Sequence, residues 1–148
     1  PDFEAWQAGR ERGLVEYCQP QRGFQVGQAG GSYNGVCNAQ LEPDFLDAYR
    51  LGSELFVLRS TLNGIIASLE ANNSDVEAID ADVAEIESII ILDETTAAER
   101  AALLADMREL SEIRGELEVE YERLIEERVL AEAALADFEL SLLGSGFR

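Results

Sequence analysis

Apolar residues recur in a strict alternation of four and three positions from Leu51 onward. The run comprises Leu51, Leu55, Leu58, Leu62, Ile65, Leu69, Asn72, Val76, Ile79, Val83, Ile86 and Ile90, in which Asn72 alone is polar. Spacing of this kind, sustained over five heptads, is typical of a left-handed coiled coil. It predicts one helix over residues 44–92, about 75 Å long at the usual helical rise.

The stretch "NNSD" at residues 72–75 raises an alternative, in which two shorter helices are separated by a break or kink. The apolar phase is the same on both sides of this stretch, and a loop has no reason to preserve phase. The pattern therefore favours the continuous helix.

A second apolar series follows the interruption "LDETTAAER". Thr96 and Glu99 have the spacing of a capping box, which marks a helix start. The series then runs Leu103, Met107, Leu110, Arg114, Leu117, Tyr121, Leu124, Arg128, Ala131, Leu135, Phe138 and Leu142. It predicts a helix over residues 96–142, ended by Gly144 and Gly146.

Two helices of similar length joined by a short turn are expected to fold back as an antiparallel hairpin. A turn centred near residues 94–95 places Leu58 opposite Ala131 and Asp75 opposite Arg114. We expect Asp75 and Arg114 to form a polar pair that fixes the register of the hairpin at some cost in stability.

Further apolar residues widen the stripe beyond what a two-helix seam needs. They include Phe56, Ile66, Ile89, Ile113 and Ile125. This excess predicts a protein partner or a homo-oligomer.

Residues 1–42 differ in composition and contain seven of the twelve glycines. Within "GFQVGQAGGSYNGVC", residues 23–37, Phe24 and Val26 alternate with polar positions, and a Gly-rich turn follows. The alternation predicts a small β-hairpin, or a loop resembling one. A phosphate-binding loop needs a Gly-Lys-Ser/Thr ending, and a dinucleotide-binding loop needs a preceding buried strand; neither is present. We interpret the stretch as scaffold.

A near-repeat connects the two parts of the chain. "PDFEAWQAGRE" begins at Pro1, and "PDFLDAYRLGSE" begins at Pro43 with one residue inserted. An early proline is compatible with a helix start, so each copy should open a helix. An aromatic residue and a glycine three positions later share a helix face, which predicts packing of Trp6 with Gly9 and of Tyr49 with Gly52. The spacing of Gly9 and Gly13 also suits a close approach of helices.

Cys18 and Cys37 flank one loop that lacks other means of order. A disulfide between them would stabilise the fold by roughly 3 kcal/mol, and it would imply an oxidising compartment. The alternative is two buried free thiols in a cytosolic protein.

The charge excludes several classes of function. The net charge is −19, all eleven cations are arginines, and there is no histidine. An acidic chain repels nucleic acid, no apolar run approaches the ~20 residues of a membrane helix, and two cysteines without histidine do not form a zinc site. No nucleophile lies next to a base. We therefore expect no enzyme, no metal and no cofactor.

The stretches "WQAGRERGLVEYC", "GFQVG", "YNGVC" and "PDFLDAYRLG" are similar to an uncharacterised bacterial cell-envelope family, filed as a domain of unknown function. The resemblance covers about residues 1–58, and members are often predicted lipoproteins. It implies a periplasmic or outer-envelope protein, tethered through a lipid on an upstream residue. It implies no catalytic activity.

Together these patterns predict a mainly α protein with a disulfide-stapled head, residues 1–42, and a long two-helix coiled-coil hairpin, residues 43–148. The expected function is a structural or assembly role in the cell envelope, as a rigid spacer or subunit. The alternative is a binding module. Residues 60–99 contain ten acids and no cation, so the hairpin end is suited to a basic protein partner or divalent cations.

Overall fold

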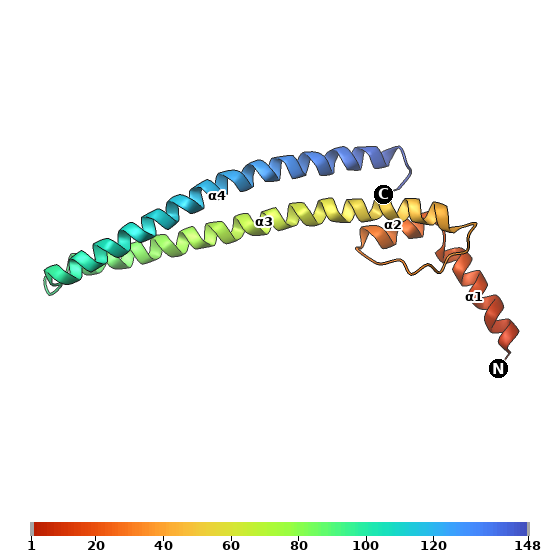
Figure 1. The fold of residues 1–148 in the computed structure, drawn as a ribbon, viewed down its shortest axis with the longest axis horizontal. Coiled ribbons are helices and arrows are strands. Elements are labelled where there is room, and N and C mark those ends of the chain that lie inside the picture. The colour runs from red at the N-terminus through yellow and green to blue at the C-terminus, as the bar shows by residue number, and fades with distance from the viewer. Residues whose placement is uncertain (1, 148) are drawn as a thin grey trace. The chain divides into compact units, whose positions relative to one another are not determined.

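The computed structural model describes residues 2–147, and this part of the chain contains four helices and no strand (Figure 1). They are α1 (Phe3–Tyr17), α2 (Pro20–Gln28), α3 (Glu42–Ile90) and α4 (Ala97–Leu143). The chain forms two compact units. The head unit comprises Pro1–Leu62 and Ala131–Arg148, and the tip unit comprises Asn63–Leu130.

The first helix begins where the sequence predicts a helix. The Asp2 carboxylate accepts hydrogen bonds from the backbone N–H groups of Glu4 and Ala5, at 3.1 and 3.2 Å, which is N-cap geometry. Pro1, the predicted opening residue, lies outside the described part of the chain. The helix ends at Tyr17, and the N–H of the C-cap residue Cys18 donates to the carbonyl of Leu14.

The predicted β-hairpin in the Gly-rich stretch is wrong, because residues 20–28 form α2. Pro20 lies in its first turn, where its missing N–H costs nothing. The buried residues of α2 are Gly23, Phe24 and Gly27, which are spaced by three and four positions. This is the period of a helix face. The alternation of Phe24 and Val26 with polar residues therefore did not indicate which residues are buried.

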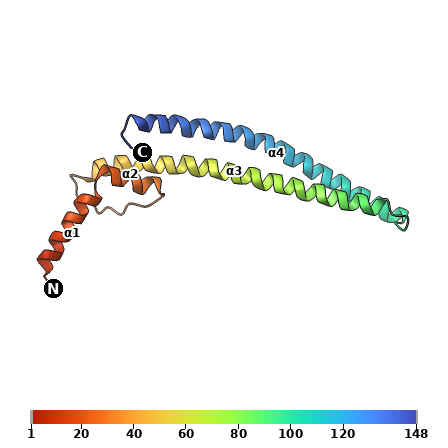
Figure 2. The same cartoon turned by 180° about the vertical axis from the view of Figure 1, so that it is seen from behind.

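Glycines bring α2 into backbone contact with α3, and both views show the two helices side by side (Figures 1 and 2). A Cβ built on Gly52 would lie 2.7 Å from the backbone nitrogen of Gln28 and 3.1 Å from the Cα of Gly27. A Cβ on Gly23 would collide with the carbonyl group of Phe45. Only hydrogen fits at these positions, because any side chain would separate the helices.

The glycine contacts predicted for the first helix are not formed within the described chain. Nothing lies within 4 Å of a Cβ built on Gly9 or Gly13, and Trp6 is 62% exposed. The close approach uses Gly52 of the predicted set, together with Gly23 and Gly27, which the sequence analysis had assigned to a hairpin.

Phe24 anchors the core of the head unit. It is fully buried with Ala48, Leu55 and Leu142, and its ring stacks on Phe147 at 5.0 Å between centroids. The carboxyl-terminal end of the described chain thus packs on α2. The burial of these side chains joins α2 to both long helices.

A second cluster surrounds the predicted disulfide between Cys18 and Cys37, which is present with a Cα–Cα distance of 5.7 Å. The ring of Phe45 is buried against it, 4.9 Å from the Tyr33 ring. The Tyr33 hydroxyl donates to Glu42 at 2.6 Å and accepts the Cys37 N–H at 3.1 Å. Burial and the Glu42 carboxylate raise the pKa of Tyr33. The loop over residues 29–41 is therefore held by side chains in place of secondary structure.

The long helices agree closely with the prediction. The helix α3 is continuous through residues 72–75, so the alternative with two segments is wrong. The predicted bounds, 44–92 and 96–142, differ by one or two residues from those observed. Every predicted seam residue is buried or half-buried except Tyr121, which is 39% exposed.

Backbone capping closes the turn between α3 and α4. The predicted capping box is present, with Thr96 N–H donating to Glu99 at 2.7 Å and Glu99 N–H donating to Thr96 Oγ1 at 3.2 Å. The bond from the Thr96 backbone N–H, and the Thr96 hydroxyl beside the carboxylate, lower the pKa of Glu99. Thr95 donates to the carbonyl of Ile89, and Arg100 donates to those of Ile90 and Leu92. The last carbonyls of α3 are thus satisfied by the start of α4.

The glycine contact generates a prediction with opposite signs at two positions of α3. We expect Gly52→Ala to destabilise the protein by about 1–3 kcal/mol, because the new methyl group overlaps the α2 backbone. Gly64 faces open space, so Gly64→Ala should stabilise by about 0.5–1 kcal/mol through helix propensity alone. Urea unfolding monitored by circular dichroism measures both. Equal effects at the two positions would contradict the contact.

Candidate functional site

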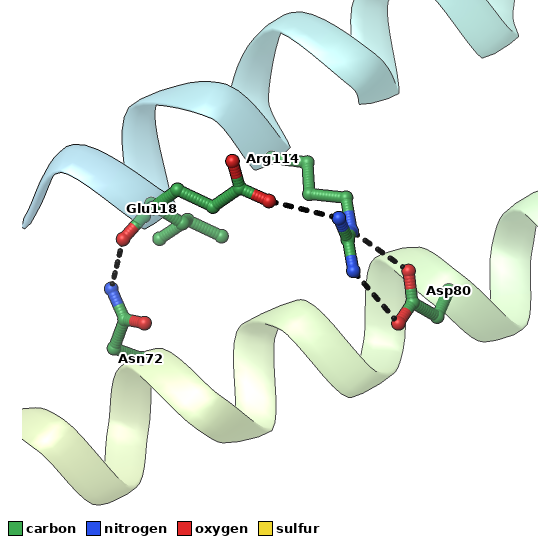
Figure 3. A network of polar contacts seen from close by, with 5 residues as sticks. Asn72, Asp80, Arg114 and Glu118 are labelled. Atoms are coloured by element: carbon green, nitrogen blue, oxygen red, sulfur yellow. Dashed lines mark hydrogen bonds and ion pairs between the residues drawn. The ribbon is translucent and has the colours of Figure 1, made fainter. Parts of the chain in front are cut away.

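A polar layer interrupts the apolar seam of the tip unit (Figure 3). Asn72 is only 4% exposed, and its Nδ2 donates to the backbone carbonyl of Leu117 at 2.9 Å. That carbonyl belongs to the facing helix, so the bond forms in one alignment of α3 and α4. A buried Asn at a seam position typically specifies register in this way.

Arg114 extends the polar layer, but its partner is not the predicted Asp75. Its Nε donates to Asp80 at 2.9 Å, a second guanidinium nitrogen reaches the other Asp80 oxygen at 3.4 Å, and a third donates to Glu118 at 3.0 Å. The bond to Asp80 raises the pKa of Arg114. Side chains lean toward the amino-terminal end of their helix. Arg114 therefore leans along α4 toward the turn, where α3 presents Asp80.

The ion pair contributes little stability. Arg114 and Asp80 have side chains 41% and 56% exposed, and half-exposed pairs contribute about 0–1 kcal/mol. The network is better explained as a device that aligns α3 with α4, because Asn72 and Arg114 each form a hydrogen bond from one helix to the other.

A groove between the helices lies beyond the polar layer, nearer the turn. Four of its lining residues are apolar, namely Ile86, Ile89, Leu110 and Ile113. The other four are acidic, with Asp82 and Glu85 from α3 and Asp106 and Glu109 from α4. The volume is about 420 Å³. Ile89 and Ile113 are two of the apolar residues that the sequence analysis found in excess of the seam.

Another groove contains Ile90, Ile91, Leu104 and Met107. Ile91 is 79% exposed, the largest exposed fraction among the exposed large apolar side chains of the described chain. Two helices alone cannot cover their own flanks, so the apolar surface near the turn remains available to a partner.

The described residues do not supply a metal centre. Within residues 2–147, no group of three or more Cys, Asp or Glu side chains is placed to hold a metal ion, and both cysteines are in the disulfide. No helix in this range is long and apolar enough to cross a membrane.

The buried Asn72 leads to a test of register. Asn72→Leu should raise the free energy of unfolding by at least about 1 kcal/mol, because an apolar side chain replaces a desolvated amide. Register should loosen at the same time. Spin labels at the exposed positions 77 and 111 would show this as a broadened distance distribution.

Val76→Leu is the matched control, since it changes a half-buried seam residue without removing a polar group. It should leave the distance distribution as narrow as in the unmodified chain. A sharp distribution in the Asn72→Leu variant would show that the apolar seam fixes register without the amide.

Comparison with known proteins gives one partial match. Residues 1–54 match the model of a family described as a protein of unknown function, DUF2799. No curated protein and no solved structure matches the chain. The resemblance to a domain-of-unknown-function family is thus confirmed for a segment that comprises α1, α2 and the first turns of α3.

Proposed function

We propose that this protein is a non-enzymatic structural or assembly protein of the bacterial cell envelope, in which the paired helices serve as a rigid spacer. The observation that carries the proposal is the continuity of α3 over 49 residues, paired with the 47 residues of α4. Such helices need a long apolar seam, polar contacts that align the two helices and a closed turn, and the chain contains features of all three kinds.

The head supports a docking role in this proposal. Its glycine contact, disulfide and buried Phe24 hold a small irregular segment in one arrangement, while α1 buries none of its residues. An ordered support that presents an uncovered helix is suited to attachment. The disulfide also supports an oxidising compartment, such as the periplasm.

Rigidity gives the spacer proposal a direct test within the tip unit. Spin labels at the exposed positions 68 and 87 of α3 are nineteen residues apart. A rigid helix predicts one narrow distance near 28 Å at about 1.5 Å per residue. A broad or bimodal distribution would contradict a spacer, because a flexible arm does not hold a separation.

A second candidate function is supported by the acidic groove near the turn. Its four apolar residues and four carboxylates suit a basic amphipathic helix, which would place apolar residues on Ile86 and Ile113 and its cations beside the carboxylates. The described residues form no metal cluster, so a protein partner is the better candidate than divalent cations.

Salt separates the two candidates. An affinity-tagged chain is isolated with its partners from the envelope fraction and washed at about 0.1 M and about 1 M salt, where the screening length falls from ~10 to ~3 Å. Contact through the head should persist at high salt, whereas contact through the acidic groove should be lost.

Charge variants identify the groove directly. Glu85→Gln with Glu109→Gln should release a groove-bound partner, because both carboxylates line the groove. The control, Glu70→Gln with Glu116→Gln, removes the same charge from exposed positions outside the groove. Release by both pairs would indicate a general effect of net charge and would argue against the groove.

A further inference from the structure

The first helix presents an aromatic surface that nothing in the described chain covers. Phe3 and Trp6 are 68% and 62% exposed, and their rings stack on one another with centroids 5.8 Å apart. No residue of α1 is buried. Both views show α1 leading away from α2 and from the start of α3 (Figures 1 and 2).

Helix geometry places Trp6 and two glycines on the same face. At about 100° per residue, Trp6, Gly9 and Gly13 fall within an arc of about 60°. A Cβ at either glycine would meet no atom within 4 Å. This face therefore combines a large exposed ring with a smooth strip of backbone.

The near-repeat shows how the same face is used elsewhere in the chain. Ala5 and Trp6, followed by Gly9, correspond to Ala48 and Tyr49, followed by Gly52. In the second repeat, at the start of α3, this face is covered. A Cβ on Gly52 would meet the backbone of α2, and Ala48 is 2% exposed.

The element that covers the second repeat is a helix with two glycines four residues apart. These are Gly23 and Gly27 of α2, and a Cβ on Gly27 would collide with the carbonyl of Tyr49 and approach Ser53 N to 2.6 Å. The helix α1 has the same spacing in Gly9 and Gly13. The helix α1 thus has the residues that α3 presents to α2. It also has the pair of glycines that α2 presents to α3.

We propose that α1 docks against α1 of a second copy of this chain, with Gly9 and Gly13 at the crossing and Trp6 packed on the partner helix. A surface that carries both halves of a contact is self-complementary, as an interface around a two-fold axis requires. The inference does not depend on the spacer role.

Charge favours α1 over the hairpin as the contact between copies. Residues 43–148 contain twenty-five acids and eight arginines, so two hairpins repel each other. The helix α1 has three acids and two arginines. The two α1 surfaces would therefore repel each other less than two hairpins would.

A single 15-residue helix from each copy makes a small interface. It lies below the roughly 1,200 Å² of a standard-size complex. We therefore expect a reversible dimer with a dissociation constant in the micromolar to sub-millimolar range, visible as a concentration-dependent mass in analytical ultracentrifugation.

Two substitutions that add the same charge to α1 test the face. Trp6→Glu should raise the dissociation constant by at least about tenfold, because it removes the central aromatic residue. Ala8→Glu lies on the opposite side of the helix and is also exposed. It should change the constant by less than about twofold.

Gly9→Ala separates dimer contact from helix stability. Alanine favours an exposed helix over glycine, so the helix content of the monomer should be unchanged or higher. The added methyl group should nevertheless weaken dimerisation by at least about threefold, because it holds the backbones apart.

Several outcomes would overturn the inference. A monomer at all concentrations up to about 1 mM would exclude a dimer of the expected strength. So would a dimer that Trp6→Glu and Gly9→Ala leave intact. A dimer abolished by Ile89→Glu, which alters the groove of the tip unit, would place the contact in the hairpin.

Discussion

The backbone contact between α2 and α3 at Gly27 and Gly52 is the constraint on which the rest of the head unit depends. Because the helices meet without intervening side chains, Phe24 is brought among Ala48, Leu55 and Leu142, and the chain end closes over it through Phe147. The same placement of α2 starts the loop that returns Cys37 to Cys18. Burial and the disulfide then preserve an arrangement that the absence of two Cβ atoms permits.

The tip unit follows a different constraint, because a two-helix hairpin has no interior beyond its seam. Each helix buries about two positions in seven, so the stability of the hairpin comes from the number of seam residues along the helices and not from a thick core. A long apolar seam is also prone to alternative alignments, and Asn72 and Arg114 oppose this by bonding to Leu117 and Asp80. The flanks of both helices remain open. Their apolar and acidic residues are therefore the surfaces that a partner would contact, while the seam keeps those surfaces in place.

The sequence was informative wherever a period was long and unambiguous. Twelve positions in 4–3 alternation predicted the course of α3 and all its seam residues, including continuity across "NNSD". The structure of the head was harder to predict, because a glycine leaves room for a close contact without indicating which helix will make it. Gly9 with Gly13 and Gly23 with Gly27 have the same spacing, yet α3 meets only the second pair. Pro20 was the available signal for α2. The partner of Arg114 was missed because facing positions were counted without the lean of its side chain.

The two candidate contact surfaces differ in how they respond to charge, and this makes them compatible on one chain. The groove near the turn is lined by Asp82, Glu85, Asp106 and Glu109, so its attraction for a basic partner falls as salt screens it. The α1 face has Trp6 and two glycines at its centre. Copies that meet there are opposed mainly by the repulsion of their acidic hairpins, and salt weakens that repulsion. Ionic strength thus acts with opposite sign on the two surfaces. The proposed contact between copies through α1 and the proposed contact of a basic partner with the groove would therefore not exclude each other on a chain with a net charge of −19.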